Sequence, residues 1–374
     1  MKILVASDKF KGSLTAAEAC EAIAAGLREG LTGDGHEIRC LPIADGGDGI
    51  AETLTAAANG EWIEVNVTGP LGDRITARYG LIEAGETAVI EMASASGLAL
   101  LGDREKDPLR ASTFGTGELI LDAISRGASE ILLGIGGSAT NDGGIGMALA
   151  LGHHFFDAAD CELTALPEAL GEVVRFVRPD HFPFPSVTVA CDVTNPLLGP
   201  NGCTAIYGPQ KGITPDFFAL HEERLGRLVE MTGPAGKAAA ARPGAGAAGG
   251  LGFGAIVFLG AHLVPGFDLV AERLGLAEAI EKADLVITGE GRLDLQSLEG
   301  KGPFGVVEMA RRKGKATAAF CGSLADRSME ASFGPISEIR DPTLSLAENM
   351  ARGRERLHAA ARNFGATLCE LDSG

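Results

Sequence analysis

The stretch EILLGIGGSATNDGGIGMALALG, residues 130–152, joins an aliphatic run to a glycine-rich loop and then to a helix-like segment. Six of the thirteen residues from 134 to 146 are glycine. A turn between a strand and a helix needs only one or two glycines, so the others indicate positive φ angles or a close approach of another group to the backbone. The stretch therefore predicts one strand, loop and helix unit of an α/β fold.

The same order recurs along the chain. Further aliphatic runs, each followed by a loop and a helix-like or polar segment, lie at 3–6, 36–44, 283–291, 315–323 and 335–341. Together with the run at 130–137 they give six strands, and the helices between them predict a mostly parallel sheet with right-handed crossovers. Thr15 followed by Glu18 forms a capping box for the first helix.

Two regions depart from this order. Residues 61–95 alternate polar and apolar side chains between turns, which predicts an antiparallel meander. Residues from about 156 to 282 mix short strand-like runs with a Gly/Ala/Pro-rich stretch. We therefore expect a three-layer α/β domain with a six-stranded parallel sheet and a second, inserted α/β domain with a mixed sheet. The first takes residues 1–60, 105–155 and 283–374, and the second takes residues 61–104 and 156–282.

Composition limits the classes of partner. The 374 residues carry a formal net charge of −18, which argues against nucleic acid or an anionic membrane surface as a partner. The seven cysteines form no C-x-x-C pair, so they predict reduced thiols in a cytoplasmic protein rather than a disulfide framework. No signal peptide or apolar run long enough to span a membrane is expected. The sequence does not predict an oligomeric state.

The glycine-rich loop offers two interpretations. Gly136, Gly137, Ser138 and Asn141 follow a strand and precede a helix, an arrangement that suits a phosphate group. The alternative is close packing of the strand against the helix, and the sequence leaves the two interpretations equally weighted. Gly115, Thr116 and Gly117 similarly precede a helix; here plain helix capping is at least as good an explanation as an anion site.

The segment ITGEGRLDLQSLEGKGP, residues 287–303, carries five charged residues among glycines at a strand end. Glu290 and Asp294 have the oxygen ligands that Mg²⁺ prefers, whereas Arg292 and Lys301 suit a carboxylate or a phosphate. The alternative is a surface loop with paired charges.

Asp192 follows another apolar run, where an aspartate serves either as a base that accepts a hydroxyl proton or as a turn cap. A GAGAAG motif at 244–249 matches a dinucleotide-binding pattern, but no strand precedes it, so we do not assign it that role.

Taken together, these loops resemble one family, the bacterial glycerate kinases that phosphorylate D-glycerate with ATP. The resemblance covers essentially the whole chain through the motifs SDKFKGS, ADGGDG, VTGPLG, AVIEMASASGL, FGTGELI, GIGGSATNDGG, CDVTNPLLGPNG, YGPQKG, PGAGAAGGLG and ITGEGRLDLQS. It implies a Rossmann-like domain with an inserted second α/β domain, and in-line transfer of a phosphoryl group from ATP·Mg²⁺, with 2-phosphoglycerate as the product.

The resemblance and the loop chemistry together assign roles to individual residues. Asp192, Arg292 and Lys11 are the expected catalytic residues. The expected substrate contacts are Asp45, Ser138, Asn141 and Asp294. Nucleotide contacts are expected from Gly115, Thr116, Gly117, Gly136, Gly137 and Ser138, and magnesium ligands from Asp45, Asp294 and Glu290.

Three other functions remain open at this point. The first is the same kinase forming 3-phosphoglycerate, the second an NAD(P)-dependent hydroxy-acid oxidoreductase, and the third a binding protein for a small acid without catalysis.

Overall fold

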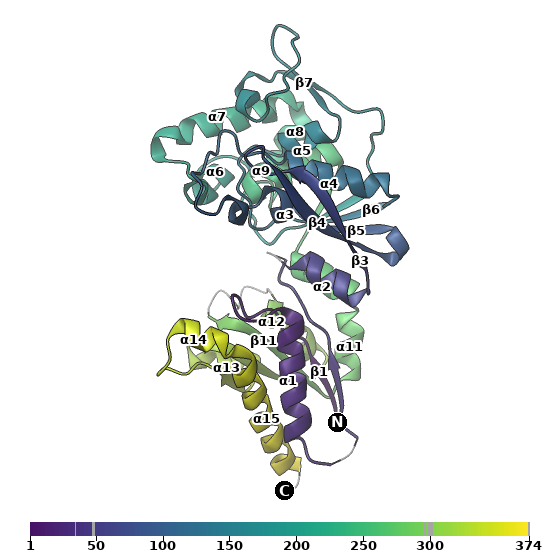
Figure 1. Cartoon of the computed structure of the whole chain (residues 1–374), viewed down its shortest axis with the longest axis vertical. Helices are drawn as coiled ribbons and strands as arrows, with labels where there is room; N and C mark the ends of the chain where they lie inside the picture. Colours follow the sequence, from purple (N-terminus) through teal and green to yellow (C-terminus); the bar gives the residue numbers. More distant parts are fainter. Residues whose placement is uncertain (34, 47–48, 295–296, 298–301, 373–374) are drawn as a thin grey trace. The chain divides into compact units, whose positions relative to one another are not determined.

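The chain folds into two compact units in a computed structural model (Figure 1), which describes residues 1–374 except 34, 47–48, 295–296, 298–301 and 373–374. Unit 1 comprises Met1–Asp45 together with Phe267–Gly374, and unit 2 comprises Gly46–Gly266.

Unit 1 is built on a five-stranded sheet in which all neighbouring strands are parallel. Its order is β13-β12-β11-β1-β2. The strands are β1 (Lys2–Val5), β2 (Glu37–Cys40), β11 (Leu285–Leu293), β12 (Ala316–Leu324) and β13 (Ile336–Glu338).

Helices cover both faces of this sheet. They are α1 (Ala16–Gly30), α10 (Gly266–Arg273), α11 (Leu276–Lys282), α12 (Gly302–Arg312), α13 (Glu330–Phe333), α14 (Leu346–Ala351) and α15 (Gly353–Asp372). Ile3 and Val5 of β1 pack in a core with α1 and α15, whereas Leu4 packs with α10, α11 and α12 on the opposite face. This alternation makes unit 1 a three-layer, doubly wound fold.

The predicted capping box begins α1. The Thr15 hydroxyl accepts a hydrogen bond from the Glu18 amide at 3.2 Å, and the Glu18 carboxylate accepts one from the Thr15 amide at 2.9 Å. These bonds satisfy backbone donors that a helix start would otherwise leave unpaired.

Unit 2 is built on a six-stranded mixed sheet of order β10-β9-β6-β5-β4-β3. Strands β3 (Glu61–Thr68), β4 (Arg74–Ile82) and β5 (Thr87–Glu91) form an antiparallel meander. Strands β6 (Glu130–Gly134), β9 (Ser186–Ala190) and β10 (His262–Val264) continue from β5 in parallel. A separate hairpin pairs β7 (His154–Phe156) with β8 (Arg175–Val177).

The helices of unit 2 pack around this sheet and the hairpin. They are α2 (Ile50–Ala57), α3 (Ala93–Ser96), α4 (Phe114–Ser125), α5 (Ile145–Ala150), α6 (Cys203–Tyr207), α7 (Pro215–Met231), α8 (Gly233–Ala240) and α9 (Ala247–Gly254). One core joins the sheet with Leu119 of α4 and Met147 of α5, and a second joins Leu225 of α7 with Phe155 and Phe253.

The predicted fold class is confirmed, and so is the meander at 61–95, but the parallel sheet of unit 1 has five strands and not six. All six expected strands exist. However, β6 hydrogen-bonds to β5 and β9 and so joins the sheet of unit 2. Residues 46–60 and 105–155 consequently lie in unit 2 and residues 267–282 in unit 1, unlike the expected domain boundaries. A continuous apolar run predicts burial on both faces but does not specify the sheet in which the strand pairs.

Across the residues that the structure describes, none of the helices combines the length and hydropathy needed to cross a membrane.

Glycine allows α1 and α15 to pack closely in unit 1, where they lie side by side (Figure 1). A Cβ atom at Gly26 of α1 would lie 2.2 Å from the His358 carbonyl oxygen of α15.

We therefore expect Gly26→Ala to lower the free energy of unfolding by about 1–3 kcal/mol, because the overpacking outweighs the gain in helix propensity. Urea denaturation measures this. The control is Gly226→Ala in α7, where nothing lies within 4 Å of the added Cβ; it should be neutral or stabilising by up to about 1 kcal/mol. Equal effects of the two substitutions would contradict the packing argument.

Candidate functional site

Carboxylates gather at the carboxyl edge of the sheet in unit 1. Asp8 follows β1, Asp45 follows β2, and Glu290 lies near the end of β11. Because β1 pairs in parallel with both β2 and β11, the segments that follow these strands meet at one edge. The Asp8 amide continues the pairing by donating to the Gly289 carbonyl at 2.9 Å.

Burial and mutual repulsion shift the pKa values of this group. Asp8 is only 5% exposed, and burial, followed by the charge of Asp45, raises its pKa to about 7. Burial also raises the pKa of Glu290 to about 7, and the charges of Asp45 and Asp294 act in the same direction. The Glu290 Oε1 atom is buried and has no hydrogen-bond partner among the described residues. A cation at this edge would relieve the repulsion.

The start of α12 lies against the same carboxylates. A Cβ atom at Gly302, which has a φ of +46°, would lie 3.3 Å from Asp8 Oδ2 and 3.4 Å from Asp45 Cβ. The N-terminal end of α12 therefore adds a partial positive charge beside this group.

Arg292 and Asp294 form an ion pair, with Nε and Oδ2 3.2 Å apart. The Arg292 side chain is 70% exposed, so most of it faces solvent. Lys11 is also exposed. Lys301, which the sequence grouped with Arg292, lies outside the described residues.

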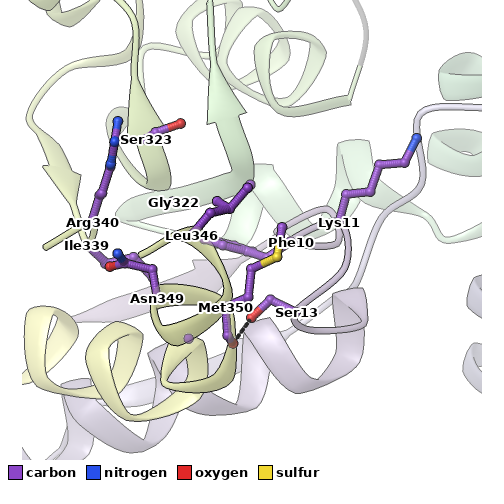
Figure 2. Close-up of a pocket in the computed structure, with 12 residues that line it drawn as sticks. Phe10, Lys11, Ser13, Gly322, Ser323, Ile339, Arg340, Leu346, Asn349 and Met350 are labelled. Atoms are coloured by element: carbon purple, nitrogen blue, oxygen red, sulfur yellow. Dashed lines mark hydrogen bonds between the residues drawn. The ribbon is translucent and has the colours of Figure 1, made fainter. Parts of the chain in front are cut away.

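A pocket opens beside this edge of unit 1 (Figure 2). It encloses about 480 Å³, including its open mouth. Its lining combines Phe10 and Lys11 from the segment after β1, glycines from the ends of β11 and β12, and side chains from the segment after β13 and from α14. Figure 2 shows Arg340 and Ser323 at one end of the pocket and Lys11 extending from the other.

The glycine-rich loop of unit 2 lies at the carboxyl end of β6. Gly137 is exposed, with a φ of +69°, and Gly136 is half-buried. Ser138 is 8% exposed and forms a bridge with Gly97, next to the Leu98 amide that donates to the Gly137 carbonyl at 2.8 Å. The loop thus presents two glycines at its surface on a fixed backbone.

A buried lysine donates hydrogen bonds to this loop from the interior of unit 2. Lys211 is 2% exposed, and its Nζ atom donates to Ser138 Oγ and to the Thr140 carbonyl, each at 2.7 Å. Burial lowers its pKa from 10.5 to about 8, and the charges of Cys203 and Asp142 oppose this shift.

Asp142 anchors the other end of the loop. Its carboxylate accepts bonds from the Thr113 amide and hydroxyl, both at 2.8 Å, and from the amides of Gly144 and Gly146 at 3.1 and 3.3 Å. Asp142 therefore ties the first turns of α4 and α5 together. Burial nevertheless raises its pKa.

The residues predicted at the start of α4 are buried in packing. A Cβ atom at Gly115 would lie 2.0 Å from the Thr68 carbonyl oxygen, and one at Gly117 would lie 2.5 Å from that of Met147. The Thr116 hydroxyl bonds with that of Ser96 at 2.9 Å. Close packing therefore accounts for both glycines.

Asn141 points into the interior of unit 2. It is 2% exposed, and its Nδ2 atom lies 3.3 Å from Thr204 Oγ1 and 3.4 Å from His221 Nδ1. Asn141 Oδ1, His221 Nε2 and Thr140 Oγ1 are buried without a hydrogen-bond partner among the described residues. This polar cluster supports the loop and does not line its surface.

Asp192 lies just beyond β9, as predicted. Its Oδ1 atom accepts a hydrogen bond from the Gly266 amide at 2.8 Å. A Cβ atom at Gly46 would lie 2.2 Å from Asp192 Oδ2, so this carboxylate lies against two segments of unit 2 far apart in sequence.

The GAGAAG motif serves the packing of unit 2. A Cβ atom at Gly249 would lie 1.9 Å from the Thr140 carbonyl oxygen, and the Gly143 amide donates to the Gly249 carbonyl at 3.0 Å. The motif therefore contacts the glycine-rich loop.

The structure brings Asp45, Glu290, Arg292 and Asp294 to one edge of unit 1 and Ser138, Gly136 and Gly137 to one loop of unit 2, with Asp192 also in unit 2. Among the residues described, no set of three or more His, Cys, Asp or Glu side chains has the geometry to hold a metal ion by itself.

Sequence reasoning missed Asp8, Asp142 and Lys211. All three stand inside motifs already quoted: SDKFKGS, GIGGSATNDGG and YGPQKG. Lys211 is, however, 71 to 73 residues from its partners in sequence, so no local pattern pairs it with the glycine-rich loop.

Comparisons with known proteins agree along the whole chain. A sequence model of the glycerate kinase family matches residues 3–369. The chain is 42% identical over 373 residues to the glycerate kinase of Halalkalibacterium halodurans, with 97% of each chain covered. It is 40% identical over 391 residues to the glycerate 2-kinase of Escherichia coli strain K12, with 98% of each covered. A crystal structure of a protein assigned as glycerate kinase 2 from Salmonella typhimurium LT2 matches with a TM-score of 0.91 at 38% identity, over 100% of both chains.

The lowered pKa of Lys211 makes stability depend on pH. Between about pH 8 and 10.5 the unfolded chain binds this proton and the folded chain does not, so the contribution of Lys211 to stability rises with pH across that interval. We expect the free energy of unfolding of the wild type, minus that of Lys211→Met, to increase from pH 8 to pH 10 in urea denaturation.

The matched control is Lys237→Met, which removes an exposed lysine of the same unit and should show no such trend. If the difference in free energy of unfolding between wild type and Lys211→Met does not change from pH 8 to pH 10, the pKa of the Lys211 amine is not lowered in the folded chain.

Proposed function

The chain belongs to the glycerate kinase family and is therefore a phosphotransferase that acts on an alcohol group, and from this premise we propose that it transfers a phosphoryl group from ATP to D-glycerate and forms 2-phosphoglycerate. The observation that carries the proposal is the family match over residues 3–369. The match includes the loops at the carboxyl edge of unit 1 and the glycine-rich loop of unit 2. The glycerate 2-kinase of Escherichia coli, similar over 98% of the chain, supports the position of transfer.

We propose that Arg292 and Lys11 bind anionic groups of the substrates. Both side chains are exposed near the carboxyl edge of unit 1, and a chain with a net charge of −18 needs local cations to hold anions. Asp294, which pairs with Arg292, orients the guanidinium, and a positioned guanidinium suits a carboxylate or a phosphate.

The carboxylates of unit 1 fit Mg²⁺. Asp45 and Glu290, joined by Asp8, present oxygen ligands, and the Glu290 Oε1 atom is buried without a described partner. They do not form a complete protein cage, but Mg²⁺ commonly binds through one or two carboxylates together with substrate phosphates and water. When bound there, Mg²⁺ would neutralise phosphate charge. Asp45 and Glu290 are thus the proposed ligands, while Asp294 is engaged by Arg292.

We propose that Gly136, Gly137 and Ser138 contact a phosphoryl group. The two glycines lie at the surface of the loop, and Lys211 fixes the Ser138 hydroxyl. Gly115, Thr116, Gly117 and Asn141 are buried, so we propose that they support this loop from within unit 2. We also propose a cytoplasmic location and small-molecule ligands, as the cysteine content and net charge indicate.

Phosphorus NMR of the product tests the function. After incubation of the full chain with ATP, Mg²⁺ and D-glycerate, we expect the resonance of 2-phosphoglycerate together with ADP. A resonance of 3-phosphoglycerate would keep the kinase but change the position of transfer, and ATP left intact would refute the proposed reaction. A parallel incubation with NAD(P) in place of ATP should show no oxidation of D-glycerate.

We propose that Asp192 accepts the proton of the attacking hydroxyl. Asp192→Asn keeps an oxygen for the Gly266 amide but removes the base. We therefore expect kcat to fall by roughly 10²- to 10⁴-fold, the range typical of a general base, with little change in KM for D-glycerate. Steady-state kinetics measure both, and Asp180→Asn, at an exposed position of unit 2, is the control. Near-normal turnover of Asp192→Asn would exclude this role.

A further inference from the structure

Apart from Lys11 at one end, the residues that line the pocket of unit 1 are assigned no role by the reaction proposed above. We propose that this pocket, between Phe10, Arg340 and Leu346, binds the base of an adenine nucleotide and that Arg340 faces its phosphates. The inference rests on the proposed function for its choice of an adenine nucleotide, and it specifies where in unit 1 that nucleotide binds.

The strand order of unit 1 places the pocket where doubly wound sheets bind ligands. From β1 the chain proceeds to β2 on one side, whereas β11, β12 and β13 proceed to the other side. The order therefore reverses between β1 and β11, and ligands of such sheets bind outside the carboxyl ends of the strands at this reversal. Phe10 follows β1, and Gly291 belongs to the end of β11; both line the pocket.

The parallel strands of unit 2 contain no such reversal. Strands β5, β6, β9 and β10 follow one another in the sheet in chain order. By this criterion unit 1 is the better place for a nucleotide base, and the loop after β6 keeps its proposed contact with a phosphoryl group.

The walls of the pocket suit a flat apolar ring. Phe10 and Ile339 are buried, at 3% and 7% exposure, whereas Leu346 at the start of α14 is 71% exposed. An exposed leucine at the mouth of a pocket is apolar surface that a bound ring would remove from water.

The wall formed by α14 is held in place before any ligand binds. The Ser13 hydroxyl donates to the Met350 carbonyl at 2.7 Å (Figure 2). Asn349 Nδ2 donates to the Asp341 and Ser345 carbonyls, both at 3.0 Å, and Ser345 forms a capping box with Glu348. A wall that is already ordered costs less conformational entropy when a ligand binds.

Charge distinguishes a nucleotide from a neutral ligand. Arg340 and Lys11 are exposed at the two ends of the pocket (Figure 2), in a chain whose net charge is −18. A cation beside an apolar slot fits a ligand that joins a flat ring to an anionic chain. D-Glycerate has no apolar surface to match Leu346 and Phe10, so the pocket does not suit the acceptor.

Two surface substitutions test the proposal in the full chain. Leu346→Asp places a negative charge against the base, and Arg340→Gln removes the cation while leaving the walls intact. We expect each variant to weaken ADP binding in titration calorimetry by roughly tenfold, which corresponds to about 1.4 kcal/mol. The KM for D-glycerate should change by less than about twofold, since the pocket does not take the acceptor.

Matched controls are Leu220→Asp on α7 and Arg362→Gln on α15, both at exposed positions, and both should bind ADP as the wild type does. Inorganic tripolyphosphate has phosphates but no base, so its binding tests the Arg340 side of the pocket separately from the Leu346 side. Arg340→Gln should weaken its binding, whereas Leu346→Asp should weaken binding of ADP by a clearly larger factor than binding of tripolyphosphate.

Kinetics distinguish two identities of the nucleotide in this pocket, namely the phosphate donor and a second, separate nucleotide. If KM for ATP rises together with the Kd for ADP, the pocket holds the phosphate donor. If the wild type binds two ADP per chain, and the variants lose one of them with KM for ATP unchanged, the pocket holds a second nucleotide. Wild-type ADP affinity and stoichiometry in both variants would overturn the proposal even if the enzyme phosphorylates D-glycerate. Failure of the wild type to phosphorylate D-glycerate would instead refute the proposed function.

Discussion

Parallel pairing of β1 with β11 is the constraint on which the candidate site of unit 1 depends. It joins residues 282 positions apart, as in the bond from the Ser7 hydroxyl to the Gly289 carbonyl at 3.0 Å. The pairing brings Asp8 and Glu290 together in surroundings poor in water, where burial disfavours their charged forms. The aliphatic side chains buried on both faces of the sheet stabilise unit 1 against this cost. A site with this much stored repulsion is the kind of place where a protein gives up stability for ligand binding.

Much of the fold could be predicted from local pattern. Short aliphatic runs gave the positions of β1, β2, β6, β11, β12 and β13, and Thr15 with Glu18 marked the start of α1, because these signals depend on residues close in sequence. The sheet that β6 joins could not be predicted in this way. Its partners, β5 and β9, are defined by pairing over long distances in sequence, and a strand buried on both faces looks the same in either sheet.

The glycines show what local sequence pattern cannot predict. The loop from 134 to 146 left two interpretations open, and the structure shows that different glycines have different surroundings. Gly144 and Gly146 face backbone atoms or side chains of their neighbours, whereas Gly137 is exposed. Lys211 was not predicted because its importance comes from Ser138 and Thr140, which only the folded chain places beside it. Composition reveals the number of glycines, and tertiary structure reveals which neighbour each one accommodates.

The chain enters and leaves unit 2 at two glycines that touch. A Cβ atom at Gly266 would lie 2.2 Å from Gly46 Cα, so a segment of about 220 residues begins and ends at nearly the same point. A module with adjacent termini can be spliced into a host at a single surface position without stretching the host backbone. In evolutionary terms, residues 46–266 have the geometry of a cassette, which a recombination event could have acquired, or could exchange, as one piece.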